Sequence, residues 1–420
     1  MSLVAISDLF NFEKGTLQSS KCVAGVYNFL TASAEWKTHN EFTCDCEALV
    51  FAAAASGSLG RTHYVNGKFI ASDLCFIITP KDEQKYPIDL QFYHILFNEL
   101  KKDIVKSTKA GTSKEAIGLK SFGKYKLPYF DIEKQRKIKS KFLESNDLKN
   151  ELITEQETQL AYLKHLRQQI LSNAIQGKLD LPHTDGESGE DLLARIKAEK
   201  AKTTKKEKTL LEIKADDIPF DIPEHWVWCR LGEICRVKVG ATPSRSEPKY
   251  WKGDIPWVAS GEVANNYISD TKEKISQEGF NSTSLIMYPK GSVLVAMIGQ
   301  GKTRGQTAVL KIDATTNQNV AGLVIEHKYL LSEYLWYFFL SRYETTRSGA
   351  SGGNQPALNG IKISNTLFPL PPMSEQIELV RKMDNLMALC DELEASIRQN
   401  QEYTQMLYQT ALREALQKPA

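Results

Sequence analysis

Residues 131–177 read DIEKQRKIKSKFLESNDLKNELITEQETQLAYLKHLRQQILSNAIQG and contain no glycine or proline before Gly177. Leucine, glutamate, glutamine and lysine dominate the stretch, and these residues favour helix. A glycine at the end with Pro182 beyond it is typical of a helix C-terminus. The pattern predicts one helix over residues 131–177, about 70 Å long at 1.5 Å per residue. That length exceeds the diameter of a small domain and favours a spacer.

The same helix occurs a second time in the chain. A shift of 241 positions, without a gap, aligns Pro128/Pro369, Gln135/Gln376, Leu148/Leu389, Leu152/Leu393, Tyr162/Tyr403, Leu166/Leu407 and Leu171/Leu412. A repeat of this length implies two copies of a large module, each a globular segment followed by a helix. Such a pseudo-dimer suits a bipartite target.

The repeat divides the chain into five parts. Short strand-like runs separated by glycine and serine turns fill both globular segments, with one helix expected near residues 90–106. We therefore predict an α+β fold with two mixed, β-rich domains, each followed by a long helix. The predicted parts are domain 1 (1–130), helix 1 (131–177), a polar linker with a short helix at 191–202 (178–221), domain 2 (222–372) and helix 2 (373–420).

Both helices show the alternating steps of four and three that mark a coiled coil. The predicted seams are Ile138, Phe142, Ser145, Lys149, Leu152, Gln156, Gln159, Leu163, Leu166 and Ile170, and Leu379, Met383, Leu386, Cys390, Leu393, Ile397, Asn400, Thr404, Leu407 and Ala411. Each seam is polar in places near its middle, so an antiparallel pair would place the polar stretches opposite each other. We expect an antiparallel coiled coil with pseudo-two-fold symmetry.

Composition indicates a folded cytoplasmic protein. The 420 residues are 42% hydrophobic, which is enough to fill real cores, and no apolar run approaches the roughly 20 residues of a membrane helix. The seven cysteines form no CxxC pair, so reduced thiols are expected, and neither a metal site nor a catalytic motif is predicted. A net charge of +2 argues against non-specific coating of DNA, but a reader of base edges remains possible.

One loop allows two interpretations. Residues 296–303, AMIGQGKT, fit a relaxed phosphate-loop pattern, but glycine and strand-forming residues follow where a nucleotide-binding loop must open a helix. The favoured alternative is a loop that presents Lys302, Thr303, Arg304 and Gln306 to DNA, because Arg and Lys pair with guanine and Gln with adenine. A third alternative is a solvated hairpin tip.

Three further stretches could contact DNA. Residues 347–355 are glycine-rich and end in Asn354 and Gln355, whose amides could bind adenine or phosphate. In the first domain the corresponding stretches would be residues 56–63, with Arg61 and Thr62, and residues 109–114, bounded by Lys109 and Lys114. For residues 347–355, an ordinary flexible loop is the alternative.

Three motifs resemble a known family. Residues 222–234, IPEHWVWCRLGEI, residues 299–307, GQGKTRGQT, with 316–319, TNQN, after them, and residues 368–376, FPLPPMSEQ, look like the specificity subunit of type I restriction-modification systems. The first half departs from the pattern. It lacks the Pro-x-x-Trp opening, and Lys134-Gln135 stands where the family favours Glu-Gln.

The resemblance implies a specific function. Each target-recognition domain would read one half of a split, asymmetric site on double-stranded DNA, and the helices would set the gap. The chain would have no catalytic activity and would bind no cofactor itself. Two methyltransferase subunits, which bind S-adenosylmethionine, and restriction subunits driven by ATP with magnesium would be its partners. Two alternatives remain, a coiled-coil scaffold for protein interactions and a phosphate-loop nucleotide-binding protein.

Overall fold

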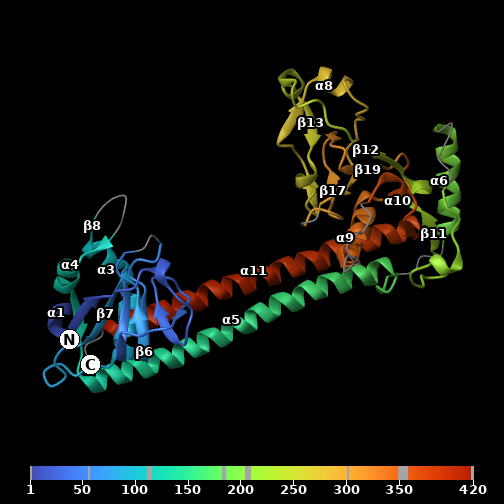
Figure 1. The fold of residues 1–420 in the computed structure, drawn as a ribbon. Coiled ribbons are helices and arrows are strands. Elements are labelled where there is room, and N and C mark those ends of the chain that lie inside the picture. Colours follow the sequence, from blue (N-terminus) through green and yellow to red (C-terminus); the bar gives the residue numbers. More distant parts are fainter. Residues whose placement is uncertain are drawn as a thin grey trace. The chain divides into compact units, whose positions relative to one another are not determined.

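The computed structural model describes residues 2–54, 57–110, 116–181, 186–203, 210–299, 302–348 and 358–417. It contains two β-rich modules and two long helices, α5 (Ile132–Ile175) and α11 (Met373–Gln417) (Figure 1). The chain divides into two compact units, Met1–Gln156 with Gln399–Ala420, and Glu157–Arg398. Each unit holds one module and part of each long helix. The predicted α+β fold is confirmed.

The ends of α5 follow the sequence signals. At its start the Asp131 carboxylate accepts a hydrogen bond from the Lys134 backbone N–H at 2.9 Å, which satisfies one of the free N–H groups of the first turn. At its end Gly177 takes a left-handed φ of 68°, and the Lys178 N–H donates to the Asn173 carbonyl at 2.8 Å. This is the bonding pattern of a glycine-terminated helix.

The first module is built around a six-stranded sheet of order β2-β7-β5-β6-β3-β4. Its helices α2 and α3 divide the single helix expected there at Leu100. The elements are β1 (Ser2–Ala5), α1 (Ile6–Leu9), β2 (Phe10–Lys14), η1 (Ser19–Lys21), β3 (Tyr27–Leu30), β4 (Lys37–His39), β5 (Cys44–Ala52), β6 (Thr62–Ala71), β7 (Cys75–Pro80), α2 (Leu90–Glu99), α3 (Lys101–Thr108), β8 (Lys109–Ala110), β9 (Ala116–Ile117), α4 (Leu119–Lys124) and β10 (Lys126–Tyr129).

The second module is built around a five-stranded sheet of order β12-β19-β16-β17-β14. The elements are α6 (Gly189–Thr203), η2 (Ala215–Asp217), β11 (Val227–Arg230), α7 (Leu231–Ile234), β12 (Arg236–Val239), η3 (Pro248–Trp251), β13 (Ile255–Val258), η4 (Ser260–Glu262), β14 (Asn266–Ile268), β15 (Glu273–Ile275), α8 (Gln277–Asn281), β16 (Val293–Ala296), β17 (Thr307–Leu310), β18 (Thr315–Thr316), β19 (Val320–Val324), α9 (Ser332–Ser348), α10 (Gly360–Ser364) and β20 (Leu367–Leu370).

The two sheets have the same topology. Strand by strand, β2, β7, β5, β6 and β3 correspond to β12, β19, β16, β17 and β14, and β3 and β14 are each parallel to their neighbour. Each module also closes with an antiparallel pair, β1 with β10 and β11 with β20, directly before its long helix. The second module adds a three-stranded sheet, β15-β13-β18. The duplication predicted from the helices therefore includes the modules.

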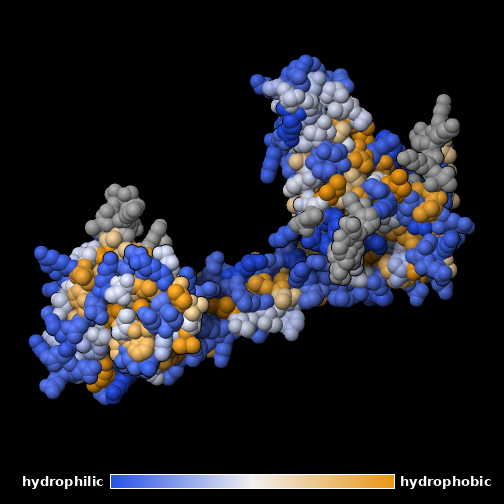
Figure 2. Space-filling view, viewed as in Figure 1, coloured by the Kyte–Doolittle hydropathy of each residue, from blue (hydrophilic) through white to orange (hydrophobic). Residues whose placement is uncertain are grey.

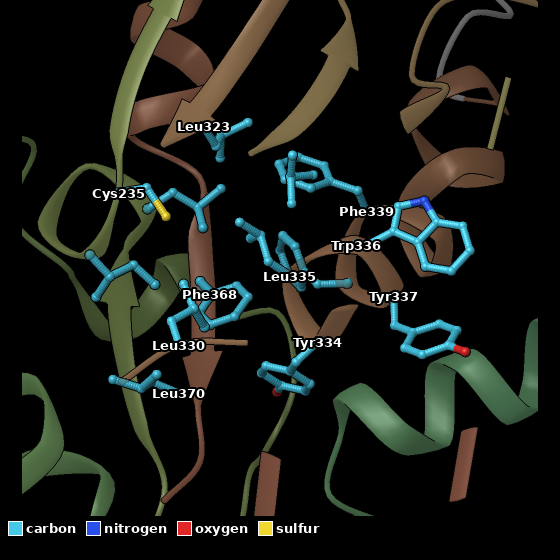
Figure 3. Close-up of a cluster of buried hydrophobic side chains, with 14 of the residues drawn as sticks. Cys235, Leu323, Leu330, Tyr334, Leu335, Trp336, Tyr337, Phe339, Phe368 and Leu370 are labelled. Carbon is cyan, nitrogen blue, oxygen red and sulfur yellow. The ribbon is translucent and has the colours of Figure 1, made fainter. Parts of the chain in front are cut away.

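The linker contributes to the core of the second module. Leu192 and Ile196 of α6 are fully buried there, and the Lys200 ammonium donates to the Gly232 carbonyl at 2.6 Å. Figure 3 shows aromatic side chains of α9 meeting residues of β19 and β20 in the same core. The predicted short helix is confirmed, but α6 packs on the module instead of lying in solvent.

The long helices pair antiparallel within each unit. In the first unit, the Phe142 ring contacts the Tyr408 ring at a tilt, with centroids 5.8 Å apart, and Gln156 donates to Thr404. Residue numbers therefore rise along α5 as they fall along α11. In the second unit, Arg167 forms an ion pair with Asp391 at 2.6 Å. The antiparallel orientation is therefore as predicted.

Half of the predicted seam is displaced by one residue. Displaced members of the predicted seam, such as Leu152 and Leu393, lie on the exposed face of their helices, where their side chains are 43% and 50% accessible. The observed seam members, buried or half-buried, are Phe142, Asn146, Lys149, Ile153, Gln156, Leu160, Leu163, Arg167, Ile170 and Ala174, and Met383, Met387, Cys390, Glu394, Ile397, Gln401, Thr404 and Tyr408. The observed seam includes polar contacts, such as Arg167 with Glu394 at 3.2 Å.

Candidate nucleic-acid interface

A tight hairpin connects the two central strands of each sheet. In the first module the Gly60 N–H donates to the Ala52 carbonyl at 2.8 Å, and in the second the Gly305 N–H donates to the Ala296 carbonyl at 2.9 Å. The two glycines have φ angles of 81° and 84°, a conformation in which other residues are strained. The predicted correspondence between residues 56–63 and the 302–306 loop is therefore confirmed.

The bonds of the next residue align the strand ends of the two hairpins, whose loops differ in length by one residue. Ala52 N–H donates to the Arg61 carbonyl at 2.8 Å, and Ala296 N–H donates to the Gln306 carbonyl at 2.9 Å. Arg61 and Gln306 thus hold equivalent positions.

Each hairpin packs on a helix that follows its sheet. A Cβ added to Gly60 would lie 2.7 Å from the Val105 side chain on α3, and one added to Gly305 would lie 3.3 Å from the Thr346 side chain on α9. Val105 and Thr346 are separated by the same 241 positions as the helical repeat. Tyr343 also donates its hydroxyl to the Lys302 carbonyl at 2.7 Å. The hairpins are therefore fixed against equivalent helical surfaces.

The structure places the four candidate residues of the second hairpin at or near the surface. Lys302 is exposed, whereas Thr303, Arg304 and Gln306 are half-buried. Nε of Arg304 is buried and has no hydrogen-bond partner in the described part of the chain. The loop leads into β17, so the helix that a nucleotide-binding loop requires is replaced by a strand.

In the first hairpin the two candidates differ. Arg61 is half-buried and donates from one guanidinium nitrogen to the Ala32 carbonyl at 3.0 Å, so it holds the loop after β3. Thr62 departs from the expectation, because its side chain is buried and bonds to the Gly60 carbonyl within the hairpin. Its backbone N–H also bonds to Asn98. Thr62 supports the hairpin and presents no open surface to a ligand.

The other predicted residues are placed only in part. Lys109 is exposed in β8, which pairs with β9. Lys114, Asn354 and Gln355 lie outside the described residues. The 302–306 loop meets α9 at Tyr343 and Thr346, directly before Arg347 in the chain.

A loop that sequence reasoning missed adjoins the first hairpin. Trp36 donates its indole N–H to Nδ1 of His63 at 3.1 Å, and Nε2 of His63 lies 2.9 Å from the Ser33 carbonyl. Burial lowers the pKa of His63, which favours the neutral ring that this arrangement requires. Trp36 remains 41% exposed. No spacing along the chain connects Trp36 with His63, so only the fold reveals this surface.

Two basic residues beside the hairpins were also missed. Lys101 begins α3 and Arg342 lies on α9, and the repeat shift relates them. The side chain of Lys101 lies close to Gly60, with Cγ 3.0 Å from the position of an added Cβ. Arg342 lies one turn before Thr346. The shift of 241 residues would have paired them, but each is embedded in an ordinary helical pattern.

Other kinds of site find little support in the described residues. Among them, no group of histidine, cysteine or acidic side chains has the arrangement of a metal site. The cysteines are free thiols, of which Cys75, Cys229, Cys235 and Cys390 are buried. No described helix combines the length and apolarity needed to cross a membrane.

Comparisons with known proteins agree with this architecture. The chain is 28% identical to the Escherichia coli EcoAI specificity subunit over 60% of its length and 44% of that protein. It is 32% identical to the Methanocaldococcus jannaschii MjaIX specificity subunit over 43% of its length and 41% of that protein. The matched stretch thus spans less than half the length of these curated relatives.

Two solved structures share the fold over nearly the whole chain. One is from a study of complex assembly and conformational transition of the type I R-M system, with a TM-score of 0.60 at 16% identity, covering 99% of this chain and 97% of that one. The HsdS subunit from Thermoanaerobacter tengcongensis gives 0.58 at 16%, covering 99% and 96%. The family described as type I restriction modification DNA specificity domain matches residues 1–162 and 223–402, and the chain belongs to that family.

Proposed function

We propose that the chain is the non-catalytic DNA-recognition subunit of a type I restriction-modification complex. Each module reads one half of a bipartite, asymmetric site, and the paired helices set the spacer between the halves. The observation that supports this best is the duplicated hairpin. Equivalent glycines with left-handed φ angles end the loop in both modules, yet Arg61 stands where the second hairpin has Gln306. The same scaffold with different side chains suits two different half-sites.

Exchange of one module tests this proposal. Replacing residues 222–372 by the equivalent module of a relative should change one half of the methylated sequence. The other half and the gap should stay the same, because each module has its own core and its own hairpin. The measurement is sequencing of methylated sites in genomic DNA from cells that also express the methyltransferase. A change in both halves contradicts independent reading, and a chain that directs no sequence-specific methylation contradicts the proposed function.

The helices also offer two equivalent surfaces for a partner. Leu148, Leu152, Tyr162 and Leu166 of α5 are all exposed, and so are their repeat mates Leu389, Leu393, Tyr403 and Leu407 of α11. At about 100° per residue each set of four lies within an arc of roughly 80°, beside the seam. Because the helices are antiparallel, both stripes fall on the same face of the pair. Apolar atoms are visible on the surface of these helices in Figure 2.

The stripes give one apolar site to each unit. The first unit contains Leu148 and Leu152 with Tyr403 and Leu407, and the second contains the repeat mates of these four residues. Exposed leucine and tyrosine side chains in a contiguous row are characteristic of a protein interface. Since the two sites are equivalent, they suit two copies of the same partner. We assign them to the two methyltransferase subunits. The restriction subunits would then bind to the complex that these subunits form with the chain.

Stoichiometry checks this assignment. Leu152→Ser with Leu407→Ser should remove one site, and Leu166→Ser with Leu393→Ser should remove the other. Each double variant should bind one methyltransferase where the parent chain binds two, as measured by native mass spectrometry. Glu151→Ser with Glu402→Ser, exposed polar positions on the same helices, is the matched control. Two bound copies in both double variants would place the docking surface elsewhere.

A further inference from the structure

The hairpin and the following helix of each module carry basic residues, and in the first module two of them lie close together. In the first module, Arg61 directly follows Gly60, which packs against the Lys101 side chain at the start of α3. Burial lowers the pKa of Lys101, and the positive charge of Arg61 lowers it further. Like charges at close range are unfavourable in the free protein. Among the described residues, Lys101 forms no ion pair.

The second module also carries one basic residue on its hairpin and one on its helix, although Gln306 and not Arg304 holds the position equivalent to Arg61. Arg304 lies between Lys302, whose carbonyl is bound by Tyr343, and Gly305, which contacts Thr346. Arg342 is one turn from Thr346 on α9. Burial lowers the pKa of Arg342, and its guanidinium forms no ion pair in the described part of the chain.

The segment that directly follows α9 in the chain supplies no acidic residue. Residues 349–357, which follow α9 in the chain and lie outside the described residues, contain neither aspartate nor glutamate. Other basic residues of the same module do have acidic partners: Lys311 pairs with Glu333 at 3.1 Å, and Arg236 pairs with Glu326 at 2.9 Å. A half-buried guanidinium without a counter-charge carries an electrostatic cost that an anionic ligand removes.

The recurrence is the strongest argument. Lys101 and Arg342 differ in residue type but occupy the same repeat position, and Val105 and Thr346 below them contact the equivalent glycines. Two cations at one repeat position, neither in an ion pair within the described ranges, indicate a shared ligand. A ligand common to two half-sites of different sequence must be the part of DNA that does not vary, which is its phosphate backbone.

We propose that the junction of the central hairpin and the following helix is a DNA phosphate-binding site in each module. Arg61 and Lys101 form it in the first module, and Arg304 and Arg342 form it in the second. This inference rests on the proposed function and adds which residues of each module bind the DNA backbone and which face the bases. The helix residue Lys101 or Arg342 anchors the backbone, so that neighbouring loop residues are placed against the bases.

Salt titration tests the proposal. Lys101→Gln and Arg342→Gln remove the charge but retain a long polar side chain. They are compared with the parent chain, each in complex with the methyltransferase, on duplexes carrying the methylated site. Each should lower the slope of log affinity against log salt by about 1, which corresponds to a roughly eightfold weaker affinity at 0.1 M salt. The loss should be equal on the cognate site and on single-base variants.

Two controls fix the interpretation. Lys102→Gln, an exposed neighbour on α3, and Lys328→Gln, an exposed residue of the second module, should each weaken binding by less than about twofold. An unchanged salt slope in Lys101→Gln and Arg342→Gln overturns the phosphate site, and so does a change of preference at one base pair. A parent complex that binds all sequences alike instead refutes the proposed function.

Discussion

Gln376→Leu should lower the free energy of unfolding of the second module by about 3 to 5 kcal/mol. The Gln376 side chain is fully buried at the first turn of α11. Its oxygen accepts from the Leu331 N–H at 3.0 Å, and its nitrogen donates to the carbonyls of Tyr329 and Pro371 at 3.2 and 3.1 Å. Leucine has a similar size but leaves three backbone groups without this partner, one buried and two partly buried, at about 1 to 3 kcal/mol each before relaxation.

The same contact recurs in the first module. Gln135 accepts from the Asp89 N–H at 2.8 Å and donates to the carbonyls of Pro87 and Phe130 at 2.9 and 2.7 Å. In both modules the glutamine joins the long helix to the segment before α2 or α9. Gln135→Leu should therefore destabilise the first module by a similar amount. Each glutamine acts as a fixed link between a module and its spacer helix.

Urea unfolding monitored separately for the two modules measures these effects. Five of the six tryptophans are in the second module, so fluorescence reports mainly on that module. Limited proteolysis with mass mapping reports on the first. Gln169→Leu, an exposed position on α5, is the control and should change stability by less than about 0.5 kcal/mol. A loss below 1 kcal/mol in Gln376→Leu would show that water replaces the missing partners.

A contact beside Gln376 explains why the first half departs from the family pattern at two places together. Glu375 accepts from the Trp226 indole N–H at 2.7 Å and lies 2.6 Å from Nε2 of His225. The Pro-x-x-Trp opening and the Glu-Gln start of α11 are thus two ends of a single tether. The first half has Lys134 at the position of Glu375 and lacks the tryptophan opening. Both absences are visible in the sequence, but the contact that connects the two motifs joins residues 150 positions apart.

The order of elements could be read from the sequence because it depends on local signals. Glycine and proline end the helices, and the gap-free repeat aligns Gln135 with Gln376. The coiled-coil phase could not be read, because Leu152 and Leu393 made the wrong phase look more apolar. Those leucines lie outside the seam, where we place a partner. The seam itself uses Gln156 with Thr404 and other polar contacts that hydrophobic periodicity does not detect.

The candidate site was predictable only where it is continuous in the chain. The 302–306 hairpin and its counterpart at residues 56–63 were found from glycine and basic residues. Arg342 and Lys101 were not found, since their significance depends on packing against Gly305 and Gly60 and on lacking an acidic partner. Burial and missing counter-charges are properties of the fold, and no spacing rule expresses them.

Lengthening both helices should abolish methylation at the original spacing. The insertions are seven residues after Gln156 of α5 and seven residues before Thr404 of α11. Because these two side chains are hydrogen-bonded, both helices are lengthened at the same position along the pair. A heptad preserves the seam in each helix. It adds roughly 10 Å at 1.5 Å per residue, which corresponds to about three base pairs at 3.4 Å each.

The half-sites should remain unchanged while the gap grows by one to three base pairs, or methylation should be lost altogether. Three added base pairs turn B-DNA by about 100° at roughly 10.5 base pairs per turn. A heptad, in contrast, leaves the modules nearly in phase with their helices. Methylation should be lost if the complex cannot absorb this difference in rotation. Sequencing of methylated genomic sites gives the gap directly, and native mass spectrometry establishes that both methyltransferases still bind. The control replaces residues 150–156 and 404–410 by the inserted heptads without changing helix length, and it should retain the parent spacing. An active, lengthened protein that still methylates the original spacing would show that something other than these helices measures the gap.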